Sequence, residues 1–220
     1  MSFLHNSVVS LLKRLRIYEK RNQSYSSTIV NILGDQKESV ILDIGSGSGK
    51  LANSLCYGEN LVIGLDLNRN VFKNPKNRSF QPILADAHKM PFVENTFNAL
   101  ISISCLEHLA SPSLAIQEIA RITKQNGICI VQLPNLQWIL EPHTKFPLLA
   151  FMPKTVKFRI LKSSGYIGLN FGVTLKNGIS WFTQSGFINT YMKSIFHQLK
   201  PFQILPWPLG WFLVFRKYFQ

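Results

Sequence analysis

Short apolar blocks, separated by polar residues and glycines, predict most of the secondary structure. Residues 40–44 are apolar except at Asp43 and predict a buried strand, and residues 50–56 follow it with the spacing of a helix. Other apolar blocks also predict strands, in a short run before Asp86 and at residues 61–65, 97–104, 128–133, 187–196 and 209–217. Helical spacing recurs at residues 114–124, before Asn126 and Gly127, and at residues 180–185. Strands that alternate with helices predict a parallel sheet covered on both faces.

The segments outside this alternating core have a different pattern. Residues 1–36 predict a helical leader, with a second helix at 24–32 that ends at Gly34. Residues 135–178 contain three prolines, six aromatic residues and six Lys or Arg. This segment is too long and too apolar for a plain loop. We expect a helical insertion there, forming a lid on the substrate side.

A glycine-rich turn follows the first predicted strand directly, with the sequence Gly45-Ser46-Gly47-Ser48-Gly49. Glycines let the backbone approach a ligand closely, and the N-terminus of the next helix offers free N–H groups. A strand that leads through such a turn into a helix predicts a nucleotide-sized cleft. The spacing is not that of the Gly-x-Gly-x-x-Gly dinucleotide fingerprint.

Four segments of the chain resemble the class I S-adenosylmethionine (SAM)-dependent methyltransferases, in their broad type 11 branch. The segments are VILDIGSGSGKLA, VIGLDLN, ILADAHKMPFVENTFNALISISCLEHL and LAIQEIARITKQNGICIVQLPN. The resemblance implies one domain over residues 1–220, with a Rossmann-like α/β fold. The expected sheet has seven strands, mostly parallel, with the last strand antiparallel beside strand six. The expected parts are the leader 1–36, a SAM-binding core 37–134, the lid 135–178 and a C-terminal part 179–220.

The same resemblance implies SAM as cofactor and assigns its contacts. The turn residues Gly45, Ser46, Gly47 and Gly49 would lie against the methionine portion, and Asp43 would reach its ammonium group. The remaining contacts follow the next three strands. Asp66 would accept hydrogen bonds from the ribose hydroxyls, and Leu67 and Met90 would flank the adenine. Asp86 would accept from the adenine amino group, the Ala87 N–H would donate to the ring, and Ile103 would lie beside the cofactor. A carboxylate suits the ribose because it has two acceptor oxygens and no donor. The alternative for Asp43 is a turn-capping role.

Three residues are candidates for the chemistry at the acceptor: Glu107, His108 and His143. Glu107 and His108 follow the fourth strand, and the fold would place His143 over the methyl group, where histidine can act as a base. Two of these residues also have a non-catalytic alternative. Glu107 can be a carboxylate at a helix end, and His143 can be a lid residue that hydrogen-bonds a backbone carbonyl. Related enzymes bind a metal through an E-x-x-E-H string, but Ser104 occupies the first position here, so we expect no metal. His88 has no supporting context and is expected to be a surface residue.

The positive charge of the chain lies outside the predicted SAM-binding core. The net charge is +13, but residues 37–134 contribute only +1, and residues 135–178 contribute +5. This distribution favours an anionic acceptor, or peripheral contact with an anionic membrane. The alternative is a basic surface with no partner. Three scattered cysteines without a CxxC pair are typical of buried thiols in a cytoplasmic protein. The apolar residues 204–215 are too few to cross a bilayer.

The function expected from these observations is methyl transfer from SAM to a small molecule. The aromatic lid favours an apolar or amphipathic acceptor, lipid-like in part, and its basic residues favour an acidic group on that acceptor, with O-methylation preferred. RNA or protein methylation, in which the basic flanks would hold phosphate, is an alternative. No RNA-binding module is visible, so nucleic acid is the less favoured partner. A non-catalytic SAM-binding protein is a third interpretation.

Overall fold

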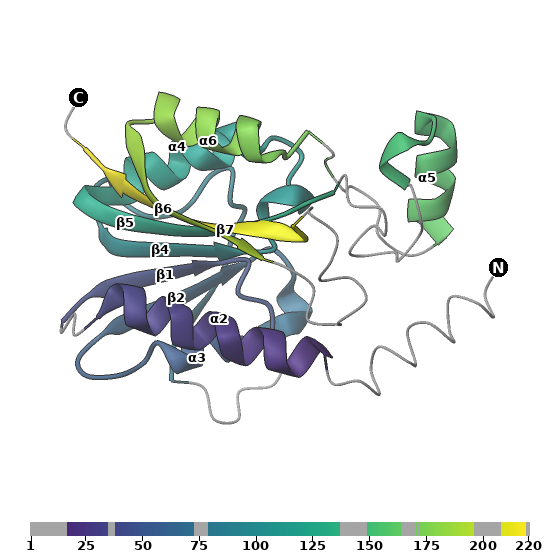
Figure 1. Cartoon of the computed structure of the whole chain (residues 1–220). Coiled ribbons are helices and arrows are strands. Elements are labelled where there is room, and N and C mark those ends of the chain that lie inside the picture. Colours follow the sequence, from purple (N-terminus) through teal and green to yellow (C-terminus); the bar gives the residue numbers. More distant parts are fainter. Residues whose placement is uncertain are drawn as a thin grey trace.

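The computed structural model describes residues 17–34, 38–72, 79–136, 149–163, 170, 172–195 and 208–218. Its α-helices are α2 (Ile17–Leu33), α3 (Lys50–Ser54), α4 (Pro112–Ile122), α5 (Lys154–Ser163) and α6 (Leu175–Gln184). Its strands are β1 (Val40–Ile44), β2 (Leu61–Asp66), β3 (Gln81–Leu84), β4 (Phe97–Ile103), β5 (Thr123–Pro134), β6 (Phe187–Ile195) and β7 (Gly210–Lys217). Three short 3₁₀ turns complete the described elements, η1 (Arg69–Phe72), η2 (Leu106–His108) and η3 (Leu149–Phe151) (Figure 1).

The strands form a single seven-stranded sheet in the order β3-β2-β1-β4-β5-β7-β6. Neighbouring strands from β3 through β5 pair in parallel, and β7 pairs antiparallel with both β5 and β6. The Rossmann-like sheet with an antiparallel last strand is therefore confirmed. The apolar C-terminal stretch predicted as a strand forms β7, and within the described residues no helix is long and apolar enough to cross a membrane.

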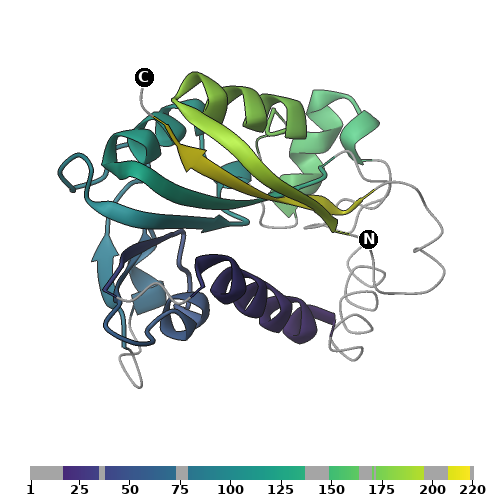
Figure 2. The ribbon, with the colours of Figure 1, turned by 60° about the vertical axis from the view of Figure 1, so that its left-hand side comes forward.

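Helices cover both faces of the sheet, so the molecule has two cores. Figures 1 and 2 show α2 and α3 on one face and α4 and α6 on the other. Side chains alternate between these cores along β1: Ile41 packs with α2 and α3, whereas Leu42 and Ile44 pack with α4 and α6. This alternation follows from the two-residue period of a strand. By the same period Asp43 points toward α3, as its hydrogen bond from Ala52 shows.

The junction between α4 and β5 corrects the prediction of a helix over residues 114–124. The helix ends at Ile122, and β5 begins at Thr123 with a bulge before Ile128, in which Asn126 has a φ of +60°. Distant groups bind the last helical carbonyls: Asn95 N–H donates to Arg121, Thr96 N–H to Ile122, and Lys217 Nζ to both Ala120 and Thr123. Carbonyls at a helix end need such partners. These partners lie far away in the sequence.

Two other helices begin earlier than predicted. The helix α2 begins at Ile17 rather than at residue 24, and it ends before Gly34, whose N–H donates to the Val30 carbonyl. The helix α6 begins at Leu175, where the Thr174 side chain accepts from the Asn177 N–H. The expected boundary between the lid and the C-terminal part, at residue 178, therefore falls inside α6. The first part of the predicted helical leader, residues 1–16, lies outside the described residues.

Candidate functional site

The candidate site lies where the strand order reverses, between β1 and β4. In an open α/β sheet, ligands bind beyond the carboxyl ends of the strands at such a switch point. The turn after β1 and the turn after β4 meet there, because a Cβ added at Gly45 would lie 2.7 Å from Cys105 Sγ. Gly45 is thus required for the close approach of the two turns. Its φ of +73° also favours glycine.

The glycine turn is held against β2 but leaves one position open. The N–H groups of Gly45 and Ser46 both donate to the Leu65 carbonyl, at 2.8 and 3.0 Å. Gly49 has a φ of +74°, and a Cβ there would lie 2.2 Å from the Phe80 ring. A Cβ at Gly47 would meet nothing within 4 Å among the described residues. Gly47 therefore borders open space, and a ligand can approach its backbone.

Asp43 is a buried carboxylate whose hydrogen bonding is incomplete. Its side chain is 2% exposed, and the Ala52 backbone N–H donates to it. Its Oδ2 atom has no hydrogen-bond partner among the described residues. Burial, opposed by the Ala52 bond and reinforced by the nearby charge of Asp66, raises the pKa of Asp43 from 3.8 to about 7. A buried acceptor without a donor suits a cationic ligand group.

Asp66, the last residue of β2, holds the glycine turn and the next loop together. Its Oδ2 accepts from the Gly47 N–H at 2.9 Å, and its Oδ1 accepts from the Asn68 N–H at 2.8 Å. A carboxylate has about four lone-pair positions, so both oxygens can accept further hydrogen bonds. Asp66 therefore anchors the glycine turn and can still accept hydrogen bonds from a ligand in the open space at Gly47.

Asp86 follows β3 and is held by His88, which the sequence analysis expected to be a surface residue. Asp86 Oδ1 accepts from the His88 backbone N–H at 2.9 Å and lies 2.6 Å from His88 Nδ1. These contacts hold the pKa of Asp86 below its usual value. The Ser111 N–H donates to His88 Nε2 at 3.2 Å, so the ring proton is on Nδ1. His88 thus connects the loop after β3 with the N-terminus of α4.

The turn after β4 holds two of the predicted catalytic residues. Ser104 has a φ of +52°, and its hydroxyl donates to Gln132 Oε1 at 2.6 Å. A positive φ at a serine is uncommon and costs about 1 kcal/mol or more.

Glu107 is fully buried, and its backbone carbonyl accepts from the Asn170 N–H, whereas His108 is exposed. Burial, with the nearby charge of Glu107, raises the pKa of Cys105 to about 12, so this thiol stays protonated near neutral pH.

The remaining predicted residues lie at different depths. Leu67 is 69% exposed beside Asp66, Ala87 is buried beside Asp86, and Ile103 is half-buried at the end of β4. Met90 is buried in the core with α4, which places it away from the surface. His143 lies outside the described residues. The structure thus brings Asp43, the glycine turn and Asp66 close together. Asp86 lies at the same carboxyl edge of the sheet, after β3, which is two strands from β1.

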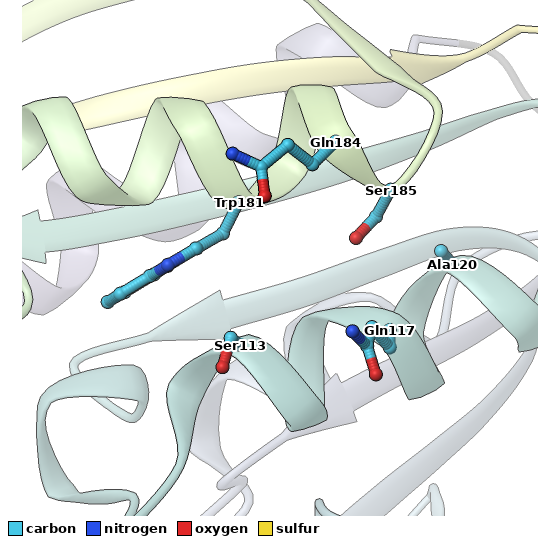
Figure 3. A pocket seen from close by; sticks show the side chains of 6 residues that line it. All are labelled: Ser113, Gln117, Ala120, Trp181, Gln184 and Ser185. Atoms are coloured by element: carbon cyan, nitrogen blue, oxygen red, sulfur yellow. The ribbon is translucent and has the colours of Figure 1, made fainter.

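Two further features of the described residues bear on the site. No group of three or more His, Cys, Asp or Glu gathers among them in a way that could hold a metal ion. A cavity of about 310 Å³ lies between α4 and α6, lined by Ser113, Gln117, Ala120, Trp181, Gln184 and Ser185 (Figure 3). None of these lining residues belongs to the turns after β1, β2 or β3. This cavity is therefore separate from the candidate site.

Comparison with known proteins finds methyltransferases similar to the core of this chain. Residues 42–131 match the family model of a methyltransferase domain, the type 11 family. The chain is 30% identical over 115 residues to the tRNA (carboxymethyluridine(34)-5-O)-methyltransferase alkbh8 of Xenopus tropicalis, covering 50% of this chain and 17% of that protein. It is 29% identical over 134 residues to the ubiquinone/menaquinone biosynthesis C-methyltransferase UbiE of Desulfotalea psychrophila, covering 57% and 54%. The chain thus spans about half or less of the length of these relatives.

A solved structure shares the fold. The S-adenosylmethionine-dependent methyltransferase of Mesorhizobium loti superposes with a TM-score of 0.66 at 13% identity, covering 87% of this chain and 96% of that one. The fold is shared with SAM-dependent methyltransferases. The segment 42–131 matches the type 11 methyltransferase domain family, and this match implies SAM as the cofactor.

The described residues fit this cofactor. SAM carries a cationic amino acid end, a ribose and an adenine. The unpartnered Oδ2 of buried Asp43, the open space at Gly47 and the acceptor capacity of Asp66 lie together at the switch point. Asp43 would hold the ammonium group, the glycine turn the methionine backbone, Asp66 the ribose and Asp86 the adenine edge.

Proposed function

We propose that the chain transfers the methyl group of SAM to an oxygen of a small, apolar or amphipathic, acidic acceptor. The observation that carries this proposal is the basic helix α5 after β5, which has exposed apolar side chains beside its cations and is held in place by the buried cluster of Leu136, Leu149 and Leu161. This cluster lies where β5 ends, at the carboxyl edge of the sheet, and the helix α5 beside it is basic. Such surroundings suit an acceptor with an apolar body and an anionic group.

Methyl transfer is an in-line displacement at carbon, for which SAM supplies an activated methyl group. The chain's task is to position the acceptor oxygen opposite the sulfur and to exclude water. The acceptor oxygen would bond to the methyl carbon as the carbon–sulfur bond breaks with its electron pair going to sulfur. A hydroxyl acceptor would also lose its proton to a base, whereas a carboxylate would have no proton to lose. We propose His143 as this base, with His108 and Glu107 beside the site. The exposed His108 is better placed for proton exchange than the buried Glu107.

Methylation of tRNA is a second candidate. The name of the Xenopus relative describes O-methylation of a carboxymethyl nucleoside in tRNA, and this chain has 24 Lys or Arg against 11 Asp or Glu. Phosphate contacts from Lys and Arg would supply most of the affinity for RNA, and that affinity would fall steeply with salt. In this case the acidic group on the acceptor would be a nucleoside substituent.

The test is incubation of the protein with radiolabelled SAM and fractions of a cell extract. The extract is divided into lipid, small-molecule, RNA and protein pools, and the pool that gains label is measured. Label in the lipid or small-molecule pool, shown by mass spectrometry of the product to be carried on oxygen, would support the proposal. Label in RNA would overturn it in favour of the second candidate. The matched control is Asp66→Ala, in which label should fall in every pool.

A further inference from the structure

The helix α5 has one buried side and one exposed side. Leu161 is 7% exposed and packs with Leu136 and Leu149, and Ile160 packs against the same cluster. These contacts fix the helix beside the end of β5. Most of the remaining surface of α5 is exposed.

The exposed side of α5 combines cations with large apolar side chains. Lys154, Phe158 and Lys162 are four residues apart, so they form one row along the helix. Phe158 is 57% exposed between the two lysines, and Arg159 is exposed next to it. In η3, just before the helix, Phe151 is 68% exposed and extends the row.

The charge of this surface has one sign. Residues 149–163 contain four Lys or Arg and neither Asp nor Glu. Both a polyanion and an anionic bilayer would complement this charge. The exposed apolar residues favour the bilayer, because Phe151 and Phe158 are 68% and 57% exposed in water. RNA phosphates would complement only the charge, and the aromatic side chains would be covered only where unstacked bases reach them.

The position of α5 leaves it accessible to a flat surface. Figure 1 shows α5 beyond the end of the sheet at which the parallel strands finish, standing away from α4 and α6. This is also the edge that holds the glycine turn. A surface that contacts α5 would therefore lie on the same side of the molecule as the candidate site.

We propose that α5 and η3 form a docking surface for an anionic lipid bilayer. Phe151 and Phe158 would enter the boundary between headgroups and acyl chains, and Lys154, Arg159 and Lys162 would bind lipid phosphates. Each such cation contributes roughly fivefold to partitioning near an anionic surface, from about 1 kcal/mol per charge. The proposal holds for any methyl acceptor.

The test is sedimentation of the full chain with vesicles, without SAM or acceptor. One set of vesicles is pure phosphatidylcholine, and the other contains phosphatidylglycerol in addition. We expect the parent to sediment with the anionic vesicles only, and less so at high salt. The variant Lys154→Gln, Arg159→Gln, Lys162→Gln should bind the anionic vesicles at least tenfold more weakly. Phe151→Ser with Phe158→Ser, which keeps the charge, should also weaken binding.

The matched control removes three exposed charges elsewhere, as Arg69→Gln, Lys176→Gln, Lys193→Gln. It has the same net charge as the α5 variant and should bind vesicles as the parent does. SAM affinity by calorimetry, equal in all variants, shows that each is folded. Equal losses in the two charge variants would overturn the proposal, as would absence of parent binding. Binding of tRNA lost in the α5 variant, while vesicle binding persists, would assign α5 to RNA instead.

Discussion

The Asp66 carboxylate accepts two backbone hydrogen bonds and still has lone pairs beside Gly47. Replacing it by alanine removes both the anchor of the turn and the proposed acceptor for the ribose hydroxyls. Hydrogen bonds to a charged group contribute about 1.5–3 kcal/mol, so we expect Asp66→Ala to weaken SAM binding roughly 10- to 100-fold. Titration calorimetry measures this change. Glu59→Ala, which removes an exposed carboxylate, is the control and should bind SAM as the parent does.

The raised pKa of Asp43 makes stability depend on pH. Its pKa is about 7 in the folded chain and near 3.8 when unfolded, so the folded state binds the proton more tightly. The contribution of Asp43 to the free energy of unfolding is therefore fully present below pH 3.8 and is lost as the pH rises to about 7. Denaturant midpoints at pH 5 and pH 8 measure this loss. Asp43→Asn should show a smaller decrease between these pH values than the parent.

His88 is a positioning residue that the sequence analysis missed, since its partner Ser111 is 23 residues away. In His88→Asn the amide nitrogen replaces Nδ1 as the donor to Asp86, whereas in His88→Gln the amide oxygen replaces Nε2 as the acceptor for Ser111. We expect Asn to retain the parent's SAM affinity and Gln to lose roughly fivefold, as for one hydrogen bond of about 1 kcal/mol. Calorimetry at pH 8 separates the two. Equal affinities would contradict a role for His88 in orienting Asp86.

At the scale of the element, substitutions in the glycine turn can distinguish glycines needed for folding from a glycine needed for binding SAM. Gly47 and Gly58 both have a positive φ, +51° and +61°, with nothing within 4 Å of an added Cβ. Alanine at either should cost about 1–2 kcal/mol of stability through backbone strain. Only Gly47→Ala should also weaken SAM binding, because its Cβ would fill the cofactor's space.

Gly49→Ala should destabilise the fold by more than either of these variants. Its Cβ would lie 2.2 Å from the Phe80 ring, which packs in the core beneath α3. Thermal unfolding with and without SAM measures both effects. A Gly49→Ala variant as stable as Gly58→Ala would contradict the close contact.

Elements whose ends are fixed by nearby residues were predicted well. The strand β1 and its turn match their predicted positions, because the apolar run and the glycines are local signals. The end of α4 was predicted two residues too late, because Asn95, Thr96 and Lys217 bind its carbonyls from distant parts of the chain. The start of α6 was missed because Lys176, Asn177 and Gly178 interrupt its apolar pattern.

At the scale of the molecule, the site is expected to work without a metal. Ser104 occupies the position of a carboxylate ligand, and its hydroxyl is used by Gln132. Turnover should therefore persist in excess EDTA, measured as methyl incorporation from SAM into the acceptor pool. Activity that is lost in EDTA and restored by magnesium would show that another set of residues builds a metal site.

The fold was predictable from the sequence, whereas the acceptor was not. Cofactor contacts follow strand ends and glycines, which recur at fixed places in this fold, so Asp43 and Asp66 could be placed from their positions alone. The proposed acceptor contacts lie on segments whose shape depends on tertiary packing, such as α5, which the cluster of Leu136, Leu149 and Leu161 holds beside the end of β5. Their sequence indicates apolar and basic surroundings but not their geometry.

The place of β7 in the sheet has a consequence for synthesis on the ribosome. Among the described strands β6 pairs only with β7, and β7 lies between β6 and β5, which ends at Pro134. Residues 187–195 therefore leave the exit tunnel before the strand they pair with, so the edge of β5 stays open during that interval. An open edge of this kind invites pairing with another nascent chain. Until β7 is synthesised and pairs with β5, a nascent chain on a neighbouring ribosome can pair with the same edge of β5. Slow translation of residues 196–217 would lengthen this period.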